Sequence, residues 1–319
     1  MTIGRTRNIA NDRDNVDFRI KLGELEKDDK VLMDEKILSL KNFGIIHRNK
    51  SKGKGFRRSA KGEELSKDYK LSNVNFELYR GNKLGITGSS GGGKSLLIKG
   101  ILGSLPKESW EIVGESKILG EYDLNRMKEA DRREVLKKYI SYIPQDSINA
   151  LNPYVGVLDQ VCREIEFTKS IKGSECEGLA IEWLEKLGLG KDRAKLNLLP
   201  QEFSGGMRQR AVFVMAMVKN PKLLIADEPS SALDVINQLN TLEILQTLAE
   251  NHDLTMIYVS HSPGMIKKLC DDIAIVSKGE LVELQSVEKF FESPKSDEGL
   301  RLLNASKELV SRGEYKGND

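Results

Sequence analysis

The sequence predicts an α/β fold built on a parallel sheet that is buried on both faces. Three short apolar stretches support this prediction: "PKLLIADEP" (221–229), "TMIYVSHS" (255–262) and "DIAIVSKGE" (272–280). None of them alternates apolar with polar residues, as a strand with one solvated face would. A helical pattern, "INQLNTLEILQTLAENH" (236–252), separates the first two stretches. Strands and helices therefore alternate along the chain, which is typical of a doubly wound core.

The first half of the chain adds further strands. Residues 36–47, "KILSLKNFGIIH", have strand character. Residues 69–88 contain two strands around a turn at 80–82, and the second strand is "KLGIT". A helical pattern, "LLIKGILGSL", begins at residue 96. We therefore expect a strand, a glycine-rich turn and a helix in immediate succession.

Two charged segments flank the strand at 36–47. Residues 1–34 mix both charges with few aromatic residues, which predicts a poorly ordered or loosely docked extension. Residues 48–68 carry eight Lys/Arg against three acidic residues. This basic insertion is either a solvated loop or a contact with nucleotide phosphates or anionic lipid headgroups.

The expected domain boundaries lie where the alternation of strands and helices stops. Residues 146–203 are mainly helical in pattern, notably "GLAIEWLEKLGL", and form an inserted helical segment. The expected main domain is 35–285, and a polar, partly helical tail follows at 286–319.

Composition excludes several classes of protein. The longest strongly apolar run, "AVFVMAMV", is far shorter than the ~20 residues of a membrane-spanning helix. The N-terminus lacks the apolar core of a secretory signal. A net charge of +2 gives no general case for nucleic-acid binding. Three cysteines without metal-ligand spacing fit a reducing compartment.

A phosphate-binding loop is the strongest motif. "GSSGGGKS" fits the pattern G-x-x-x-x-G-K-[ST], in which backbone N–H groups and a helix N-terminus surround phosphate oxygens. Lys94 is expected to reach the β- and γ-phosphates, and the Ser95 hydroxyl to ligate Mg²⁺. The loop residues are Gly88, Ser89, Ser90, Gly91, Gly92, Gly93, Lys94 and Ser95.

Two carboxylates end a buried strand downstream. "LLIADE" places Asp227 and Glu228 side by side after four apolar residues. NTPases with such a loop hold Mg²⁺ with an Asp at the end of a neighbouring strand, which makes Asp227 the candidate ligand. Glu228 is the candidate general base for the attacking water.

The order of the motifs resembles that of ABC-type ATPases. After the phosphate loop come "SYIPQD" with Gln145, then "FSGGMRQR", "ADEPSSALD" and finally His261. This resemblance covers roughly residues 36–285. It implies a P-loop NTPase core with an inserted helical subdomain and a small antiparallel β subdomain, and it implies ATP and Mg²⁺ as ligands.

The resemblance also implies roles for single residues. Gln145 would contact Mg²⁺ and the attacking water. His261 would contact the γ-phosphate and would join Glu228 and Lys94 as a catalytic residue. Asp234 would cross the interface of a dimer.

A second glycine-containing helix start would complete a partner's site. Ser204 precedes Gly205 and Gly206 and is expected to cap a helix whose N-terminus favours an anion. It has no lysine or Mg²⁺ ligand. In ABC ATPases the corresponding motif closes over ATP held by the other subunit.

Flanking residues narrow the resemblance to one branch. "PQDSINALNP" (144–153), "PQEFSGGMRQR" and "PKLLIADEPSSALDV" resemble the oligopeptide, dipeptide and nickel importer group. The sequence departs from that group at Gln201, where His is common, and at Ser262–Pro263, where Asp-Leu is usual. The basic insertion also obscures the aromatic that stacks on adenine. Tyr69 is the favoured candidate and Phe56 the alternative.

The predicted function is therefore ATP hydrolysis that powers import of peptides or nickel complexes at the cytoplasmic face of the membrane. The implied partners are a second ATPase subunit, identical or paralogous, integral membrane permeases and, indirectly, a solute-binding protein; no nucleic acid is expected. The alternatives are a soluble ABC ATPase of phosphonate processing, DNA repair or translation, and a subunit that binds ATP without hydrolysing it. Intact Lys94, Asp227, Glu228 and His261 argue against the last of these.

Overall fold

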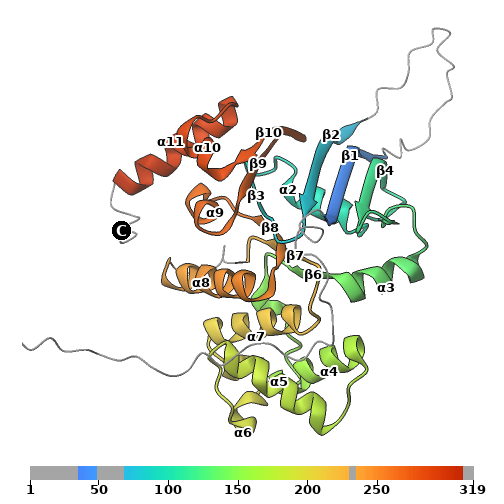
Figure 1. Cartoon of the computed structure of the whole chain (residues 1–319), viewed down its shortest axis with the longest axis vertical. Helices are drawn as coiled ribbons and strands as arrows, with labels where there is room; N and C mark the ends of the chain where they lie inside the picture. Colours follow the sequence, from blue (N-terminus) through green and yellow to red (C-terminus); the bar gives the residue numbers. More distant parts are fainter. Residues whose placement is uncertain (1–34, 49–67, 230–234, 312–319) are drawn as a thin grey trace, which may run out of the picture.

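The computed structural model describes residues 35–48, 68–229 and 235–311, and one ten-stranded sheet runs through these ranges (Figure 1). The strand order is β5-β4-β1-β2-β10-β9-β3-β8-β7-β6. The strands are β1 (Lys36–His47), β2 (Tyr69–Tyr79), β3 (Lys83–Thr87), β4 (Trp110–Ile118), β5 (Tyr122–Asp123), β6 (Ile140–Ile143), β7 (Leu223–Asp227), β8 (Thr255–Val259), β9 (Asp272–Ser277) and β10 (Glu280–Ser286).

Helices cover both faces of the parallel half. The α-helices of the described ranges are α2 (Lys94–Ile101), α3 (Glu129–Tyr139), α4 (Val157–Lys169), α5 (Ser174–Lys186), α6 (Arg193–Leu196), α7 (Gly205–Met217), α8 (Val235–His252), α9 (Pro263–Leu269), α10 (Val287–Glu292) and α11 (Asp297–Ser311). Two short 3₁₀ turns, η1 (Ser147–Ala150) and η2 (Pro200–Glu202), flank the segment that contains α4 to α6.

The parallel half agrees with the prediction from the apolar runs. Strands β6, β7, β8, β3 and β9 pair in parallel in that order. Every residue of β7 and β8 is buried. Leu224 packs in one hydrophobic cluster, with α7 and α8, whereas its neighbour Ile225 packs in another, with α2. Burial on both faces is the reason these strands lack alternation.

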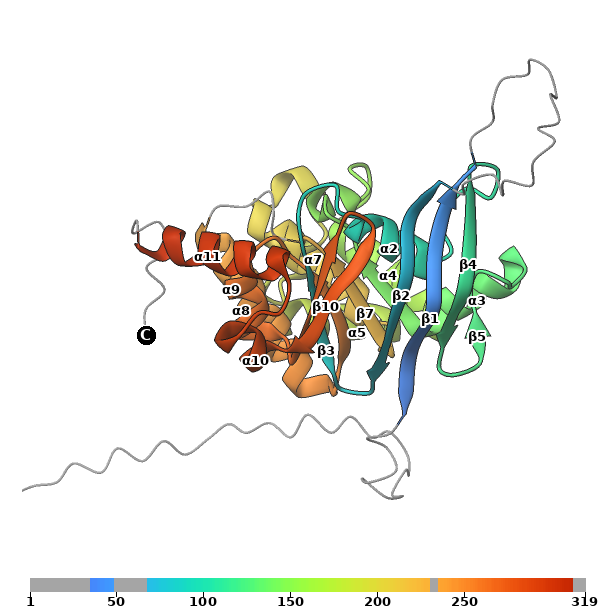
Figure 2. The ribbon, with the colours of Figure 1, turned by 90° about the horizontal axis from the view of Figure 1, so that it is seen from above.

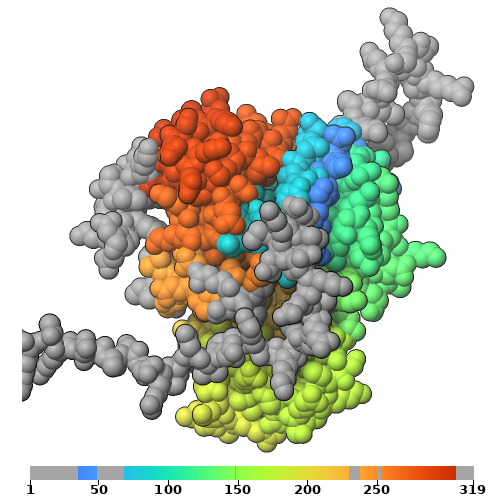
Figure 3. Space-filling view, in the orientation of Figure 1, coloured from blue at the N-terminus to red at the C-terminus, as the bar shows by residue number. Residues whose placement is uncertain are grey.

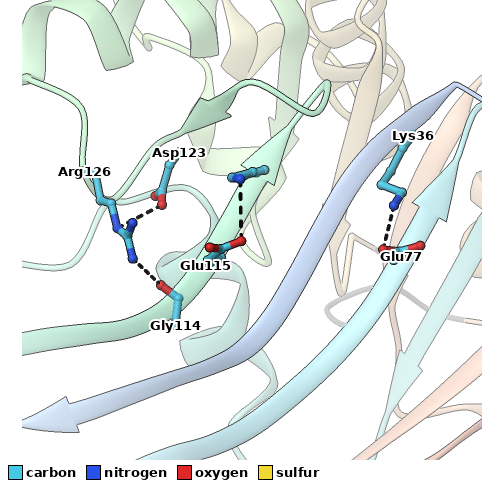
Figure 4. A network of polar contacts seen from close by, with 7 residues as sticks. Lys36, Glu77, Gly114, Glu115, Asp123 and Arg126 are labelled. Atoms are coloured by element: carbon cyan, nitrogen blue, oxygen red, sulfur yellow. Dashed lines mark hydrogen bonds and ion pairs between the residues drawn. The ribbon is translucent and has the colours of Figure 1, made fainter.

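The other half of the sheet is antiparallel. Strand β1 pairs with β2 on one side and β4 on the other, and Figure 2 shows the three side by side. This half joins the parallel half through β10, which pairs with β2 at Glu280 and Ser72. Surface ion pairs such as Lys36–Glu77, 2.6 Å apart, run across its strands (Figure 4).

The inserted helices lie at one end of the molecule. Helices α4, α5 and α6 gather beyond α7, away from β1, β2 and β4 (Figure 1). In the space-filling view they form the yellow-green end, and the red C-terminal helices form part of the opposite end (Figure 3). Phe167 on α4 reaches back toward α3, where Lys137 lies 3.8 Å from its ring centroid.

A buried carboxylate holds the C-terminal helices to the sheet. Glu283 on β10 is 5% exposed and accepts hydrogen bonds from the backbone N–H of Lys295 and of Ser296, at 2.8 and 2.9 Å. The Ser296 hydroxyl and the Gln285 amide donate to it as well. The start of α11 therefore depends on one side chain of the sheet.

We expect Glu283→Ala to lower the free energy of unfolding by about 3 kcal/mol, because several buried donors lose a charged acceptor. Thermal unfolding followed by circular dichroism measures the effect. The matched control is Glu280→Ala, an exposed carboxylate on the same strand. Equal melting temperatures for the two variants would contradict the assigned role.

Candidate nucleotide site

The phosphate loop joins β3 to α2 and requires glycine at specific positions. Gly88 has φ +142°, and a Cβ there would lie 1.9 Å from the carbonyl oxygen of Val276. Gly93, at the N-cap of α2, has a left-handed φ of 113°. Any larger residue at these positions would displace β9 or strain the turn. The sequence pattern thus reflects close packing of the loop against β9.

Lys94, the first residue of α2, is buried beneath this loop. Its Nζ donates to the carbonyl oxygens of Gly88 and Ser89, at 2.9 and 3.0 Å. Burial lowers the pKa of Lys94, whereas the charges of Glu228 and Asp227 act in the opposite direction. The ammonium group is therefore positioned within the loop by backbone contacts.

Asp227 ends β7 and is 3% exposed. Its Oδ2 accepts a hydrogen bond from the Tyr142 hydroxyl at 3.4 Å, whereas its buried Oδ1 has no partner among the described residues. Burial and the Glu228 carboxylate raise the pKa of Asp227, while Tyr142 and Ser95 lower it. An unpartnered carboxylate oxygen near a serine hydroxyl is a donor set that suits Mg²⁺.

Glu228 lies at a strained turn directly after Asp227. Its φ is +49°, a conformation that costs a non-glycine residue on the order of 1–3 kcal/mol. The side chain is 7% exposed, and Gln145 Nε2 donates to Oε2 at 3.0 Å. His261 Nε2 lies 2.6 Å from Oε1. The turn thus brings the carboxylate between two polar side chains from different parts of the chain.

These side chains surround one cavity of about 420 Å³. Its lining includes Ser90, Gly91, Gly93, Lys94, Ser95, Gln145, Glu228 and His261. All of these residues belong to motifs that predict the site: the phosphate loop at 88–95, and the segments that contain Gln145, Glu228 and His261. The structure brings them to one edge of the parallel sheet, where the strands β3, β7 and β8 end.

The cavity lining also includes three residues that the sequence does not indicate as part of the site, one of which is Leu96 on α2. Trp110 at the start of β4 and Lys70 on β2 both line it. Trp110 pairs with His47 in the β1–β4 ladder, and the two rings meet edge to face at 4.8 Å. The only signal in the sequence was the rarity of tryptophan, which occurs twice in the chain.

Other predicted residues lie elsewhere. Tyr69 does not line the cavity; its Cε1 would lie 3.4 Å from a Cβ built on Gly44, and the residue is 47% exposed. Ser204 also lies outside the cavity lining. Phe56 and Asp234 fall outside the described residues.

Ser204 caps α7 as expected, because its side chain accepts a hydrogen bond from the Met207 N–H at 3.3 Å. Ser204 is exposed, and a Cβ added at Gly205 would meet no atom within 4 Å. The start of α7 is therefore exposed at Ser204, and there is room for a side-chain atom at Gly205.

A buried amide connects α7 to the turn at Glu228. Gln209 Nε2 donates to the carbonyl oxygen of Pro229 at 2.9 Å, and Thr241 donates to Gln209 Oε1. The Ser147 hydroxyl donates to the same Pro229 oxygen. Pro229, the residue after Glu228, is thus tied both to α7 and to the segment that follows Gln145.

A phosphate loop on a parallel sheet, a strand-end Asp–Glu pair and a helical insertion leading to a Ser-Gly-Gly helix start define an ABC-type ATPase. The chain belongs to the ABC transporter family, whose model matches residues 71–231.

Curated relatives and solved structures agree with this family. The oligopeptide transport ATP-binding protein OppD of Bacillus subtilis is 36% identical over 249 residues, which covers 76% of this chain and 68% of that protein. The dipeptide transport ATP-binding protein DppD of the same organism is 32% identical, over 75% of this chain and 72% of that protein. The structure of a dimeric bacterial ABC transporter cassette matches with a TM-score of 0.63 at 25% identity, over 79% of this chain and 99% of that one.

Proposed function

We propose that this ATPase supplies the energy for a peptide importer, by hydrolysing MgATP at sites shared between two cassettes. The observation that carries the catalytic assignment is the buried Glu228 carboxylate, held by Gln145 on one side and His261 on the other. The peptide assignment is supported by relatives named for oligopeptide and dipeptide transport. The same names favour peptides over the nickel complexes that the motifs left open.

The residues divide the reaction between them. The loop N–H groups and Lys94 would bind the β- and γ-phosphates. Glu228 would take a proton from the water whose oxygen attacks the γ-phosphorus, and the bond to the ADP oxygen breaks. His261 would contact the γ-phosphate and, with Gln145, keep the Glu228 carboxylate aimed at the water.

Mg²⁺ would neutralise charge on the β- and γ-phosphates. Ser95 and Asp227 are the residues that would hold it, with Gln145 as a further ligand. The buried Oδ1 of Asp227, which has no partner among the described residues, supports this assignment.

The open helix start at Ser204, Gly205 and Gly206 would close over ATP held by a second subunit. Its separation from the cavity of its own chain supports this proposal, as do the exposure of Ser204 and the open space beside Gly205. The N-terminus of α7 would then complete the partner's phosphate site, and Asp234 would lie at the same interface.

A groove next to Gln145 is the proposed contact with the permease. It has a volume of about 170 Å³ and lies between β6, the segment after Gln145, and α7. Tyr142, Leu151, Val212 and Met215 line it, and the Lys219–Glu164 ion pair, 3.1 Å apart, borders it. An apolar groove beside the residue that contacts Glu228 would link permease movement to the catalytic turn. On this proposal the chain works at the cytoplasmic face of the membrane; no helix in the described ranges is long and apolar enough to cross it.

Peptide uptake in cells tests the proposed function. Met215→Glu is expected to reduce uptake at least tenfold, because a charge in an apolar groove opposes docking. ATP hydrolysis by the isolated protein should persist, since the groove is outside the cavity. Val282→Glu, at an exposed apolar position on β10, is the control. Normal peptide uptake in a strain whose only copy carries Met215→Glu would contradict the proposal.

We propose further that Trp110, rather than Tyr69, supplies the surface for the nucleotide base. Trp110→Ala should weaken ATP binding about tenfold, the typical loss for one base–aromatic stack, whereas Trp110→Phe should retain most of the affinity. Isothermal titration calorimetry measures both. Tyr69→Ala tests the residue that the sequence favours for stacking on adenine. A tenfold loss of ATP affinity in Tyr69→Ala, with no loss in Trp110→Ala, would show that Tyr69 and not Trp110 contacts the base.

A further inference from the structure

A second cavity lies on the far side of the strand start that contains Trp110. Its volume is about 200 Å³, and it is enclosed by the connection between α2 and β4, the start of β4, and Arg132 of α3. Trp110 borders this cavity as well as the nucleotide cavity. The two cavities therefore share one indole side chain.

The second cavity has an excess of positive charge. Arg48, Lys107 and Arg132 line it, against the single carboxylate of Glu111. Arg48 lies 3.7 Å from Glu111 and donates to the Lys107 carbonyl. Neither the Lys107 ammonium nor the Arg132 guanidinium forms an ion pair within the described residues. Two cations are thus left uncompensated at one small concavity, which concentrates their field.

Arg132 differs in this respect from neighbouring arginines. Arg126 is engaged by Asp123 and by the Gly114 carbonyl, as Figure 4 shows. Arg133 pairs with Glu129 on the outer face of α3. The Arg132 side chain instead extends over the end of α2, where its Cδ lies 3.0 Å from a Cβ built on Gly103. Packing sets the position of the Arg132 side chain, and its guanidinium N–H groups form no ion pair with the described residues.

A buried amide provides the second, independent observation. Asn125 lines the same cavity, and both its Oδ1 and its Nδ2 are buried without a hydrogen-bond partner among the residues that the structure describes. Buried polar atoms without partners call for an unseen water or ligand. Water alone would satisfy the amide but would leave the charges of Lys107 and Arg132 uncompensated.

We propose that this cavity binds a phosphate group, either of free phosphate or of a lipid headgroup, at a site distinct from the phosphate loop. The guanidinium of Arg132 offers paired donors that match phosphate geometry, Lys107 offers a point charge and Asn125 offers an amide donor. A dianion balances the two uncompensated cations. Because Trp110 borders both cavities, a phosphate group in the second cavity would lie against the same indole that lines the nucleotide cavity.

Titration of the full chain with inorganic phosphate, followed by ³¹P NMR, tests this site. A saturating non-hydrolysable ATP analogue with Mg²⁺ fills the phosphate loop, so that phosphate bound at Lys94 does not contribute. We expect saturable binding that Arg132→Met weakens about tenfold and Asn125→Leu weakens less, because a charged donor contributes more than an amide. Arg132→Lys should restore part of the affinity and guards against a folding defect.

Arg133→Met is the matched control, one residue away and on the outer face of α3. It should leave phosphate binding unchanged. No saturable binding by the parent chain to phosphate or to anionic vesicles, or an equal loss in Arg132→Met and Arg133→Met, would overturn the proposal. A parallel assay with phosphatidylglycerol vesicles separates the sources of the phosphate: vesicle binding that depends on Arg132, without binding of free phosphate, would identify a lipid headgroup as the occupant.

Discussion

Glu228→Gln is expected to lower ATP turnover by about a hundredfold or more, the usual contribution of a positioned general base. The glutamine amide has nearly the shape of the carboxylate but does not accept the proton of the attacking water. ATP affinity should change little, because Lys94 and the loop glycines remain in place. A steady-state hydrolysis assay and an ATP-binding titration on the same preparation measure the two quantities.

Substitutions at the two residues that contact Glu228 give a further test of its role. His261 and Gln145 both contact Glu228, so substitutions at either should reduce turnover through the position of the carboxylate. Glu280→Gln, on exposed surface of β10, is the matched control for loss of a charge. If Glu228→Gln hydrolyses ATP at the parent rate, another group acts as the base and the assignment is wrong.

Ser204→Arg should abolish turnover at the site whose phosphate loop belongs to the partner, because a cationic side chain fills the helix start that would cap that ATP. In a homodimer both sites are lost. The same is expected of Lys94→Ala, which removes the cation within the phosphate loop. Each variant alone should therefore be inactive.

Mixing the two inactive variants distinguishes shared sites from self-contained ones. A mixed dimer has one site with an intact Lys94 and an intact Ser204, contributed by different chains. Random pairing would restore about a quarter of the parent activity if the two sites act independently. Activity that stays at the level of the separate variants in a verified mixed dimer would contradict the shared site.

Short-range sequence patterns were sufficient to predict the parallel core and most of the residues that line the nucleotide cavity. Unbroken apolar runs predicted strands buried on both faces, and β7 and β8 are such strands. The pattern at 88–95 predicted a phosphate loop because glycines let backbone N–H groups approach phosphate oxygens without side chains in the way. These features depend on residue type at short range.

The aromatic residue that lines the cavity, Trp110, could not be predicted from short-range residue patterns. Trp110 reaches the cavity through the antiparallel pairing of β4 with β1, which sets it opposite His47 across a long stretch of chain. Tyr69 is the candidate that the sequence favours, yet the pairing of β2 with β1 places it outside the cavity lining, with its ring beside Gly44. Register between distant strands is set by packing over the whole sheet, and a motif does not encode it.

The sequence by itself determined which chemical groups this ATPase has: the loop glycines, Lys94, the Asp227–Glu228 pair, Gln145, His261 and the capped helix start at Ser204. The tertiary structure decided how those groups meet. It placed Glu228 in a left-handed turn between Gln145 and His261, tied that turn to α7 through Gln209, and left Ser204 outside the lining of its own cavity. Short-range residue patterns specify loops and caps, whereas contacts between segments far apart in the chain arise only when the whole core packs.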